Sequence, residues 1–358
     1  RLPRAAACRG GLRRPPRRCR RKTLSTISMA SRARRNDDDC LESFLAMPLV
    51  SVVIPAYNCS RYIAETIASI LGQSANDLEV IVINDGSTDD TAAIARRFGP
   101  PVRVLEQANS GVCSARNHGI REARGEFIAL VDHDDYWLPD KLANQLAAFA
   151  DHPQVDVVFT RFIWWRQTEQ GLFPEPSSFA AQAQPQGIDD ELSGWIYHQM
   201  LLDSWVLTST ALTRASVIRA HQGFDESLPF SEDWDLWMRI SRSSQFLKLR
   251  EASTLYRQHP SQGSRVTRTV DYRVRLLEGA SRRWGLCSQD GRCITARRFK
   301  RQLAMYCTEF GLGHLKGGPG ASRQIAARSF LKAWAIDHTY WRSLAYLAVT
   351  PLGWAPKW

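Results

Sequence analysis

Three aspartates stand close together where a short apolar run ends. The run 127–131 (FIALV) is typical of a buried strand, and Asp132, Asp134 and Asp135 follow it directly. In an open α/β sheet the carboxyl ends of the strands form the ligand crevice. Side chains alternate along an extended backbone, so we expect Asp132 and Asp134 to point one way and His133 the other. Converging carboxylates suit Mg²⁺ or Mn²⁺, which also binds phosphates, and this predicts a nucleoside diphosphate site.

Alternating strands and helices must position these carboxylates. Short β-branched runs predict buried strands at residues 49–55, 78–83, 102–106, 127–131 and 155–160. Apolar residues about four apart predict helices at residues 61–73, 111–124 and 232–241. This alternation predicts an α/β fold with a doubly wound, mixed but largely parallel sheet. Residues 164–186 are rich in Gln, Pro and Ser, so we expect a loop or irregular excursion over the site.

The length and composition suit one large α/β domain with an extension. Of the 358 residues, 44% are hydrophobic and 23% charged, which is typical of a soluble globular protein. We expect a catalytic domain at residues 47–262 and a helical C-terminal extension at residues 263–358. The sequence has no signal-peptide core and no apolar stretch that could span a bilayer, so we expect a cytoplasmic location.

The net charge of +11 is concentrated at the N-terminus. Residues 1–46 contain thirteen Lys and Arg against four Asp and Glu, whereas the remaining chain has 34 basic and 32 acidic residues. The tail has no apolar run, so we expect it to be disordered. A nucleic-acid-binding arm or an organellar transit segment would have this composition. Because residue 1 is Arg and Met47 precedes the first strand, we instead expect translation to begin at Met47, or at Met29, and the tail to be dispensable.

The eight cysteines show no metal-binding pattern. Three of them lie in the basic tail, and the other five are scattered without a Cys-x-x-Cys spacing. We therefore expect reduced thiols rather than disulfides or a zinc site.

Five motifs follow one another in a fixed order. They are VVIPAYN at 52–58, NDGSTD at 84–89, NSGVCSARNHG at 109–119, DHDD at 132–135 and SEDWDLW at 231–237. This ordered set resembles the family 2 glycosyltransferases, which are inverting, nucleotide-sugar-dependent enzymes of the GT-A fold. The resemblance covers roughly residues 48–260. Five motifs in order are far more specific than any one of them.

The resemblance implies a nucleotide-sugar site built from the first four motifs. Tyr57 would offer its ring to the base, Asp85 would accept the imide N–H of uracil or thymine, and Arg116 would contact the diphosphate or the base edge. Taken alone, Tyr57 could be a packing aromatic, Asp85 a turn residue, and Arg116 a solvated helix residue paired with Glu122 or Glu126. The full expected set is Pro55, Ala56, Tyr57, Asn58, Asp85, Gly86, Arg116, Asp132 and His133.

The resemblance also assigns a metal site. Asp132 would contact the ribose or the donor sugar and share the metal, while Asp134 would ligate the metal that bridges the two phosphates. Asp135 would be a reserve ligand. His133 could touch the metal, although a packing or surface role suits its alternate orientation better.

The last motif implies the acceptor side of the reaction. Asp233 would be the general base that deprotonates the acceptor hydroxyl, and Glu232 would contact the acceptor. Both carboxylates could instead simply cap a helix N-terminus. Sugars stack on indole rings, so Trp205 and Trp234 could form an acceptor platform, whereas Trp237 lies at core helix spacing.

The expected reaction is sugar transfer with inversion from a nucleoside-diphosphate donor, UDP- or dTDP-linked, to a glycan or lipid-linked acceptor. Such a reaction would serve bacterial cell-surface polysaccharide or glycolipid synthesis. A sugar-phosphate nucleotidyltransferase remains an alternative, but it should carry a Gly-rich basic loop after the first strand, where this chain has PAYN. Nucleic-acid binding through the basic tail is the other alternative.

Residues 322–358 combine apolar faces with basic residues and several Trp. They could form a helical hairpin packed on the catalytic domain. Alternatively they could form an interfacial helix pair that holds the protein at the inner face of the plasma membrane.

Overall fold

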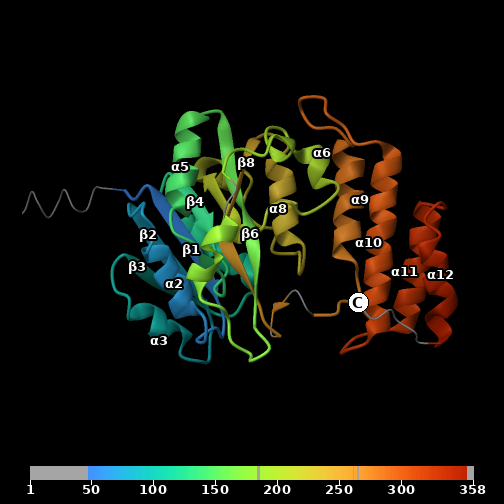
Figure 1. Cartoon of the computed structure of the whole chain (residues 1–358), viewed down its shortest axis with the longest axis horizontal. Helices are drawn as coiled ribbons and strands as arrows, with labels where there is room; N and C mark the ends of the chain where they lie inside the picture. The colour runs from blue at the N-terminus through green and yellow to red at the C-terminus, as the bar shows by residue number, and fades with distance from the viewer. Residues whose placement is uncertain (1–46, 184–185, 261, 264–265, 353–358) are drawn as a thin grey trace, which may run out of the picture. The chain divides into compact units, whose positions relative to one another are not determined.

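An eight-stranded mixed sheet forms the centre of the protein (Figure 1). The computed structural model describes residues 47–183, 186–260, 262–263 and 266–352, so the expectations for residues 1–46 lie outside it. The strand order is β3-β2-β1-β4-β7-β6-β8-β5. The strands are β1 Val50–Ala56, β2 Leu78–Asp85, β3 Val102–Gln107, β4 Phe127–Leu130, β5 Tyr136–Trp137, β6 Val155–Arg166, β7 Ala211–Arg214 and β8 Gln245–Gln258.

The first four strands are parallel, as the alternating pattern predicts. β1 pairs with β2 and β4, and β2 pairs with β3. Because both faces of this part are covered, the strands are almost uninterrupted apolar runs. Val52 and Ile54 belong to the core on one face, and Val53 belongs to the core on the other. The predicted α/β class with a mixed sheet is confirmed.

The second half of the sheet departs from the prediction. β7 is antiparallel to β4 and β6, and β8 is parallel to β6. β6 continues to Arg166, so residues 164–166 are strand rather than loop, and Trp165 is buried. β8 was not predicted at all, because its alternating charged and apolar residues lack a continuous apolar run.

Helices cover both faces of the sheet. One face carries α2, α3 and α5, and the other carries α4, α6, α8, α9 and α10. The bounds of the helices are α2 Ile63–Leu71, α3 Thr91–Arg96, α4 Val112–Glu122, α5 Lys141–Asp151, α6 Tyr197–Met200, α7 Ala215–Ala220, α8 Glu232–Ile240, α9 Tyr272–Trp284, α10 Ala296–Lys316, α11 Arg323–Ile336 and α12 Arg342–Val349. Short 3₁₀ turns lie at Pro176–Ala183, Asp190–Leu192, Thr208–Thr210 and Thr350–Leu352.

Close approach of α4 to β1 depends on a glycine. A Cβ atom at Gly119 would lie 2.2 Å from Cγ1 of Val53, far inside van der Waals contact. Glycine therefore allows α4 to pack directly on the strand that leads into the site. Asn117, two residues earlier in the chain, donates from Nδ2 to the carbonyl oxygen of Phe224 at 2.9 Å. α4 thus also fixes the segment that precedes α8.

The C-terminal helices pack closely on the core and extend it. Figure 1 shows α9 and α10 beside α8, with α11 and α12 beyond α10. The rings of Trp234 on α8 and Tyr306 on α10 meet edge to face, with centroids 5.8 Å apart. At Gly311 a Cβ would lie 2.6 Å from the Phe330 ring, so α11 packs closely on α10. Within the described residues, no helix combines the length and apolar character needed to cross a bilayer.

One disulfide contradicts the expectation of reduced cysteines. Cys287 and Cys293 are bonded to each other and close the connection between α9 and α10. The expectation failed because the residues between them fold back as a hairpin that brings the two thiols together. Cys59, Cys113 and Cys307 are buried thiols without a disulfide, in line with the expectation for these three.

Candidate active site

The acidic motif lies on a turn rather than on a strand. β4 ends at Leu130, and the chain turns at His133 and Asp134. The alternation of an extended backbone therefore does not apply, and the two aspartates contact different partners. Asp132 accepts a hydrogen bond from Arg116 at 2.6 Å, while Asp134 accepts one from His259 at 2.8 Å.

Buried polar contacts hold this turn in place. The hydroxyl of Thr66 lies 2.9 Å from the carbonyl oxygen of His133 and 2.8 Å from that of Asp135. Nε of Arg257 donates to the carbonyl oxygen of Asp134 at 2.6 Å. The guanidinium of Arg257 in turn lies 3.8 Å from the ring centroid of Trp165, and such stacking stabilises a buried cation.

The side chain of Asp135 is buried behind the turn and supports it instead of facing the site. Its side chain is fully buried and accepts the backbone N–H of Arg257 at 3.2 Å. Burial, together with the charges of Asp134 and Asp132, raises the pKa of Asp135 well above its ordinary value. The expected role of reserve metal ligand does not suit a carboxyl group that is fully buried and contacts the backbone of Arg257.

His259 is a functional candidate that the sequence did not reveal. It follows the end of β8, and its Nε2 atom lies beside Oδ2 of Asp134. Burial alone would raise the pKa of Asp134, but the hydrogen bond from His259 and the nearby charges of His133 and His259 lower it. Asp134 is therefore an anion next to an imidazole. A carboxylate is a ligand that both Mg²⁺ and Mn²⁺ use, whereas an imidazole suits a transition metal better than Mg²⁺.

The described residues contain no group of three or more His, Cys, Asp or Glu side chains in metal-binding geometry. A pair of protein ligands nevertheless fits a metal whose remaining positions are taken by substrate phosphates and water. His133 does not join the pair, because its Nδ1 atom donates to the carbonyl oxygen of Pro55 at 3.1 Å. Its ring thus packs toward the end of β1.

The loops after β1 and β2 are joined to each other. Asn58 adopts a positive φ of 46° and accepts the backbone N–H of Thr88 through Oδ1 at 2.8 Å. Its own N–H donates to the hydroxyl of Ser87 at 3.0 Å. Pro55 and Ala56 are buried at the end of β1, whereas Tyr57 is 47% exposed. The ring of Tyr57 is thus available for stacking and is not part of the core.

Asp85 organises the entrance to α4. Its Oδ1 atom accepts the backbone N–H of Ser110 at 2.8 Å, and Oδ2 accepts that of Gly111 at 2.9 Å. Gly86 follows with a φ of +71°, and a Cβ there would lie 2.9 Å from the backbone nitrogen of Asn109. Nε2 of Gln107 also donates to Oδ1 at 2.8 Å. The carboxylate therefore has a structural role, and one lone pair on Oδ2 remains with which it can accept a bond from a ligand.

Arg116 connects the two halves of the site. Its side chain is only 6% exposed and forms ion pairs with Asp132 at 2.6 Å and Glu232 at 3.0 Å. The alternative of a solvated pair with Glu122 or Glu126 is therefore wrong, because α4 turns Arg116 inward. The guanidinium of Arg116 thus links the turn at residues 132–135, here called the acidic turn, to the start of α8.

Asp233 has a pKa well above that of an ordinary aspartate. Burial and the neighbouring Glu232 raise its pKa from 3.8 to about 7, and the charge of Arg116 opposes that rise. Oδ1 of Asp233 accepts the backbone N–H of Trp234 at 2.7 Å, which orients the carboxylate. A base with a pKa near neutrality is well matched to proton transfer at physiological pH.

The two tryptophans that were expected to stack on the acceptor differ sharply in their exposure. Trp234 is 3% exposed, and its Nε1 atom donates to the carbonyl oxygen of Met200 at 2.8 Å. Its faces are covered by the core, so the expectation that it stacks on an acceptor is wrong. Trp205 is 38% exposed and keeps an available surface. Trp237 is buried, as its helical spacing predicts.

Comparison with known proteins bears on the family and the fold of the chain. Residues 51–185 match the model of glycosyl transferase family 2. An uncharacterized glycosyltransferase of Rickettsia typhi is 33% identical over 199 residues, which cover 55% of this chain and 60% of that protein. Chondroitin synthase of Pasteurella multocida is 29% identical over 211 residues, which cover 57% of this chain and 20% of that enzyme. The chain thus spans less than two thirds of the first relative and about a fifth of the second.

A solved structure shares the fold. Residues 1–349 of TarS from S. aureus, in complex with UDP-GlcNAc, superpose with a TM-score of 0.56 and 21% identity. The superposition covers 85% of this chain and 86% of the TarS chain. This likeness extends beyond the sheet into the C-terminal helices. Residues 51–185 therefore form a glycosyl transferase family 2 domain, and the chain shares its fold, the GT-A fold, with TarS.

Proposed function

We propose that the chain transfers a sugar from a nucleoside-diphosphate donor to an acceptor hydroxyl with inversion at the anomeric carbon. The observation that carries this proposal is the position of Asp233. Its raised pKa suits a base, and Arg116 ties the neighbouring Glu232 to Asp132 of the acidic turn. A base on the acceptor side thus lies next to a carboxylate on the donor side.

In this reaction Asp233 accepts the proton of the acceptor hydroxyl as its oxygen attacks the anomeric carbon. Glu232 contacts the acceptor. Arg116 holds Asp132 and Glu232 at a fixed separation, so the two substrates are aligned before the bond breaks. Inversion follows from direct displacement, because the nucleophile attacks opposite the leaving diphosphate.

Asp134 and His259 would hold a divalent cation, with Asp132 nearby. When bound, Mg²⁺ or Mn²⁺ supplies positive charge that stabilises the departing diphosphate. The chemistry of this donor set supports the proposal, since an anionic oxygen ligand and an imidazole nitrogen face each other at 2.8 Å. Arg257 and Thr66 contribute by keeping the turn rigid.

The donor nucleotide would lie against the loops after β1 and β2. Tyr57 is exposed where a base can stack, and Asn58, Asp85 and Gly86 shape the same loops. The UDP-GlcNAc bound to TarS supports a uridine donor for this chain, with a dTDP-sugar as the related choice. Chondroitin synthase supports an acceptor that is part of a cell-surface polysaccharide or glycolipid.

We also propose that residues 47–262 carry out catalysis and that residues 263–358 support it. The outer helices favour contact with a membrane surface from the cytoplasmic side. Leu331 and Trp334 on α11 are 50% and 37% exposed, and Trp341 and Leu344 at the start of α12 are 67% and 40% exposed. Basic residues that suit anionic head groups accompany them, namely Arg323, Arg328, Lys332 and Arg342.

The alternative of a sugar-phosphate nucleotidyltransferase has less support. That class needs a Gly-rich basic loop after the first strand, whereas β1 runs into Pro55 and Ala56 and then Tyr57. Nucleic-acid binding would depend on residues 1–46, which lie outside the described residues.

A donor screen tests the proposed function. Wild-type protein is incubated with UDP-, dTDP- and GDP-sugars, with Mg²⁺ or Mn²⁺ and with EDTA, and released nucleoside diphosphate is measured. We expect cation-dependent release from a UDP- or dTDP-sugar and much less from the Asp233→Asn variant once an acceptor is present. Release of pyrophosphate from a nucleoside triphosphate and sugar phosphate would instead establish a nucleotidyltransferase.

A further inference from the structure

A hollow of about 310 Å³ lies next to the residues that lead into α8. It is bounded by Phe230, by the segment 266–273 and by the second half of α10, including Phe310, Gly313 and His314. Phe230 stands three residues before Asp233 in the chain. Three residues span at most about 11 Å of backbone, so the hollow begins within reach of an acceptor held at the base.

Aromatic and basic groups line this hollow together with Asp271, whose carboxyl group has a pKa raised by burial. The guanidinium of Arg268 lies 4.1 Å from the ring centroid of Phe230. Among the described residues, no carboxylate lies within ion-pair distance of Arg268, whereas Arg273 pairs with Glu309 at 3.1 Å. Arg268 donates only to the backbone oxygens of Val266 and Gly263, so it retains N–H groups for a ligand.

His314 fixes the segment that carries Arg268. The backbone N–H of Ser322 donates to its Nδ1 atom at 3.1 Å, so the proton of the neutral ring is on Nε2. Nε2 then donates to the carbonyl oxygen of Arg268 at 3.0 Å. The ring of Phe310 packs edge to face on His314, with centroids 4.8 Å apart. His314 on α10 thus fixes the backbone at Arg268, while the guanidinium is held by the Phe230 ring and by two carbonyl oxygens of its own segment.

We propose that this hollow binds an anionic group of the acceptor, a phosphate or a carboxylate, through Arg268, with a sugar or linker of the acceptor against Phe230 and Phe310. The proposal rests on the proposed function and specifies the class of acceptor. The cation of Arg268, unpaired among the described residues, and the short stretch of chain between Phe230 and Asp233 support it. An acceptor bound there would approach Asp233 from the side of the C-terminal helices.

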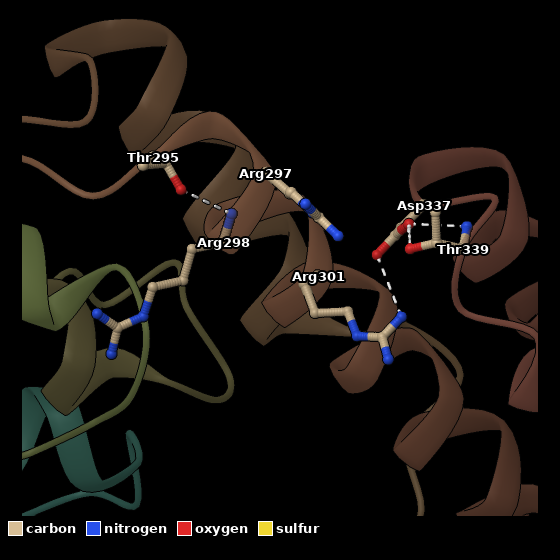
Figure 2. Close-up of a pocket in the computed structure, with 6 residues that line it drawn as sticks. All are labelled: Thr295, Arg297, Arg298, Arg301, Asp337 and Thr339. Carbon is tan, nitrogen blue, oxygen red and sulfur yellow. Dashed lines mark hydrogen bonds and ion pairs between the residues drawn. The ribbon is translucent and has the colours of Figure 1, made fainter.

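A second basic hollow, of about 530 Å³, supplies a control. It is lined by Arg297, Arg298 and Arg301 near the start of α10, where Arg301 bridges to Asp337 at 3.4 Å (Figure 2). Arg297 and Gly313 are sixteen residues apart on one helix, which corresponds to about 24 Å. Binding of an acceptor near Asp233 should therefore not depend on this distant hollow.

Ligand-observed NMR with small probes tests the proposal. The probes are glycerol 3-phosphate and glucuronate, with glycerol and glucose as uncharged partners, and UDP is measured in the same samples. We expect the wild type to bind the anionic probes in preference to the uncharged ones. Arg268→Ala should weaken that binding by roughly tenfold or more, as loss of a charge-assisted contact implies, while Arg297→Ala changes it less than twofold.

A second pair of variants tests the hollow without removing any side chain that packs in it. Gly313 has open space around its Cβ position, so Gly313→Leu projects a side chain into the hollow, and Gly279→Leu on α9 is the matched control. We expect Gly313→Leu alone to abolish probe binding. Probe binding that is unchanged in both Arg268→Ala and Gly313→Leu, or that is lost in Arg297→Ala, would overturn the proposal. Failure to bind UDP would count against the proposed function instead, and preference between phosphate and carboxylate identifies the anionic group.

Discussion

The Nε2 atom of His259 lies 2.8 Å from Oδ2 of Asp134, although 125 residues separate them in the chain. β4 delivers one partner and β8 the other, and these strands lie on different halves of the sheet. The contact therefore exists only when both halves have folded together. It gives the acidic turn a nitrogen ligand in addition to its carboxylates.

Removing either partner should impair the use of metal. We expect Asp134→Ala to lower metal-dependent release of nucleoside diphosphate by on the order of 10² or more, since the leaving group loses its stabilising charge. His259→Ala should raise the cation concentration for half-maximal rate by roughly tenfold or more. Titration of Mn²⁺ against initial rate measures both, with His152→Ala as the control. Near-wild-type turnover of Asp134→Ala would refute the assignment.

Asp233→Asn should separate catalysis from donor binding. The amide cannot accept the acceptor proton, so transfer should fall by a factor on the order of 10² or more. Calorimetric titration with UDP should give an unchanged dissociation constant, because Asp233 lies on the acceptor side. A parallel loss of UDP affinity would place Asp233 in the donor site.

The pKa of Asp233 predicts the acid limb of the pH profile. Its pKa of about 7 reflects burial and the adjacent Glu232, opposed by Arg116 and raised slightly further by Asp132. The base works only when deprotonated, so kcat/KM should fall about tenfold per pH unit below pH 7 and level off above it. A rate that stays flat down to pH 5 would show that another group takes the proton.

Gly119→Ala should destabilise the fold. The new methyl group would lie 2.2 Å from Val53, which is fully buried, and overpacking of this kind costs about 1–3 kcal/mol. Gly279→Ala on α9 meets no atom within 4 Å and should stabilise its helix by about 0.5–1 kcal/mol. Urea unfolding of both variants measures the two changes, and a Gly119→Ala protein as stable as wild type would contradict the packing argument.

The exposed residues of α11 and α12 predict binding to anionic vesicles. Co-sedimentation with phosphatidylglycerol vesicles should be strong for wild type and much weaker when Trp341 and Leu344 are both changed to serine. Binding should also fall with added salt, because basic residues contribute. Val112 is an exposed apolar residue on α4, so Val112→Ser is the control. Equal, negligible sedimentation of all three proteins would leave these helices without a membrane role.

Local patterns predicted the parts of the site that depend on local sequence. The expected bounds of the first strands and of α8 agree with the structure to within a residue or two, because continuous apolar runs and helical spacing determine them. Asp132, Asp233 and Arg116 were identified through their motifs, and Arg116 indeed lies between carboxylates of two motifs.

Other features depend on contacts that no local pattern encodes. β8 carries charged residues at Lys248, Arg250 and Glu251, so its strand character arises from pairing with β6. His259 was missed for the same reason, since its role depends on where β8 ends. Trp234 was misjudged because its burial depends on Tyr306 of a helix more than 60 residues later.

The pairing of Trp165 with Arg257 across β6 and β8 has a consequence for insertions and deletions. Adding a single residue to β8 before Arg257 would turn every later side chain of the strand to the opposite face. The guanidinium would leave the Trp165 ring, and the imidazole of His259 would leave Asp134. We therefore expect length variation among related proteins to be confined to surface connections such as the one between α9 and α10, with the end of β8 fixed in length.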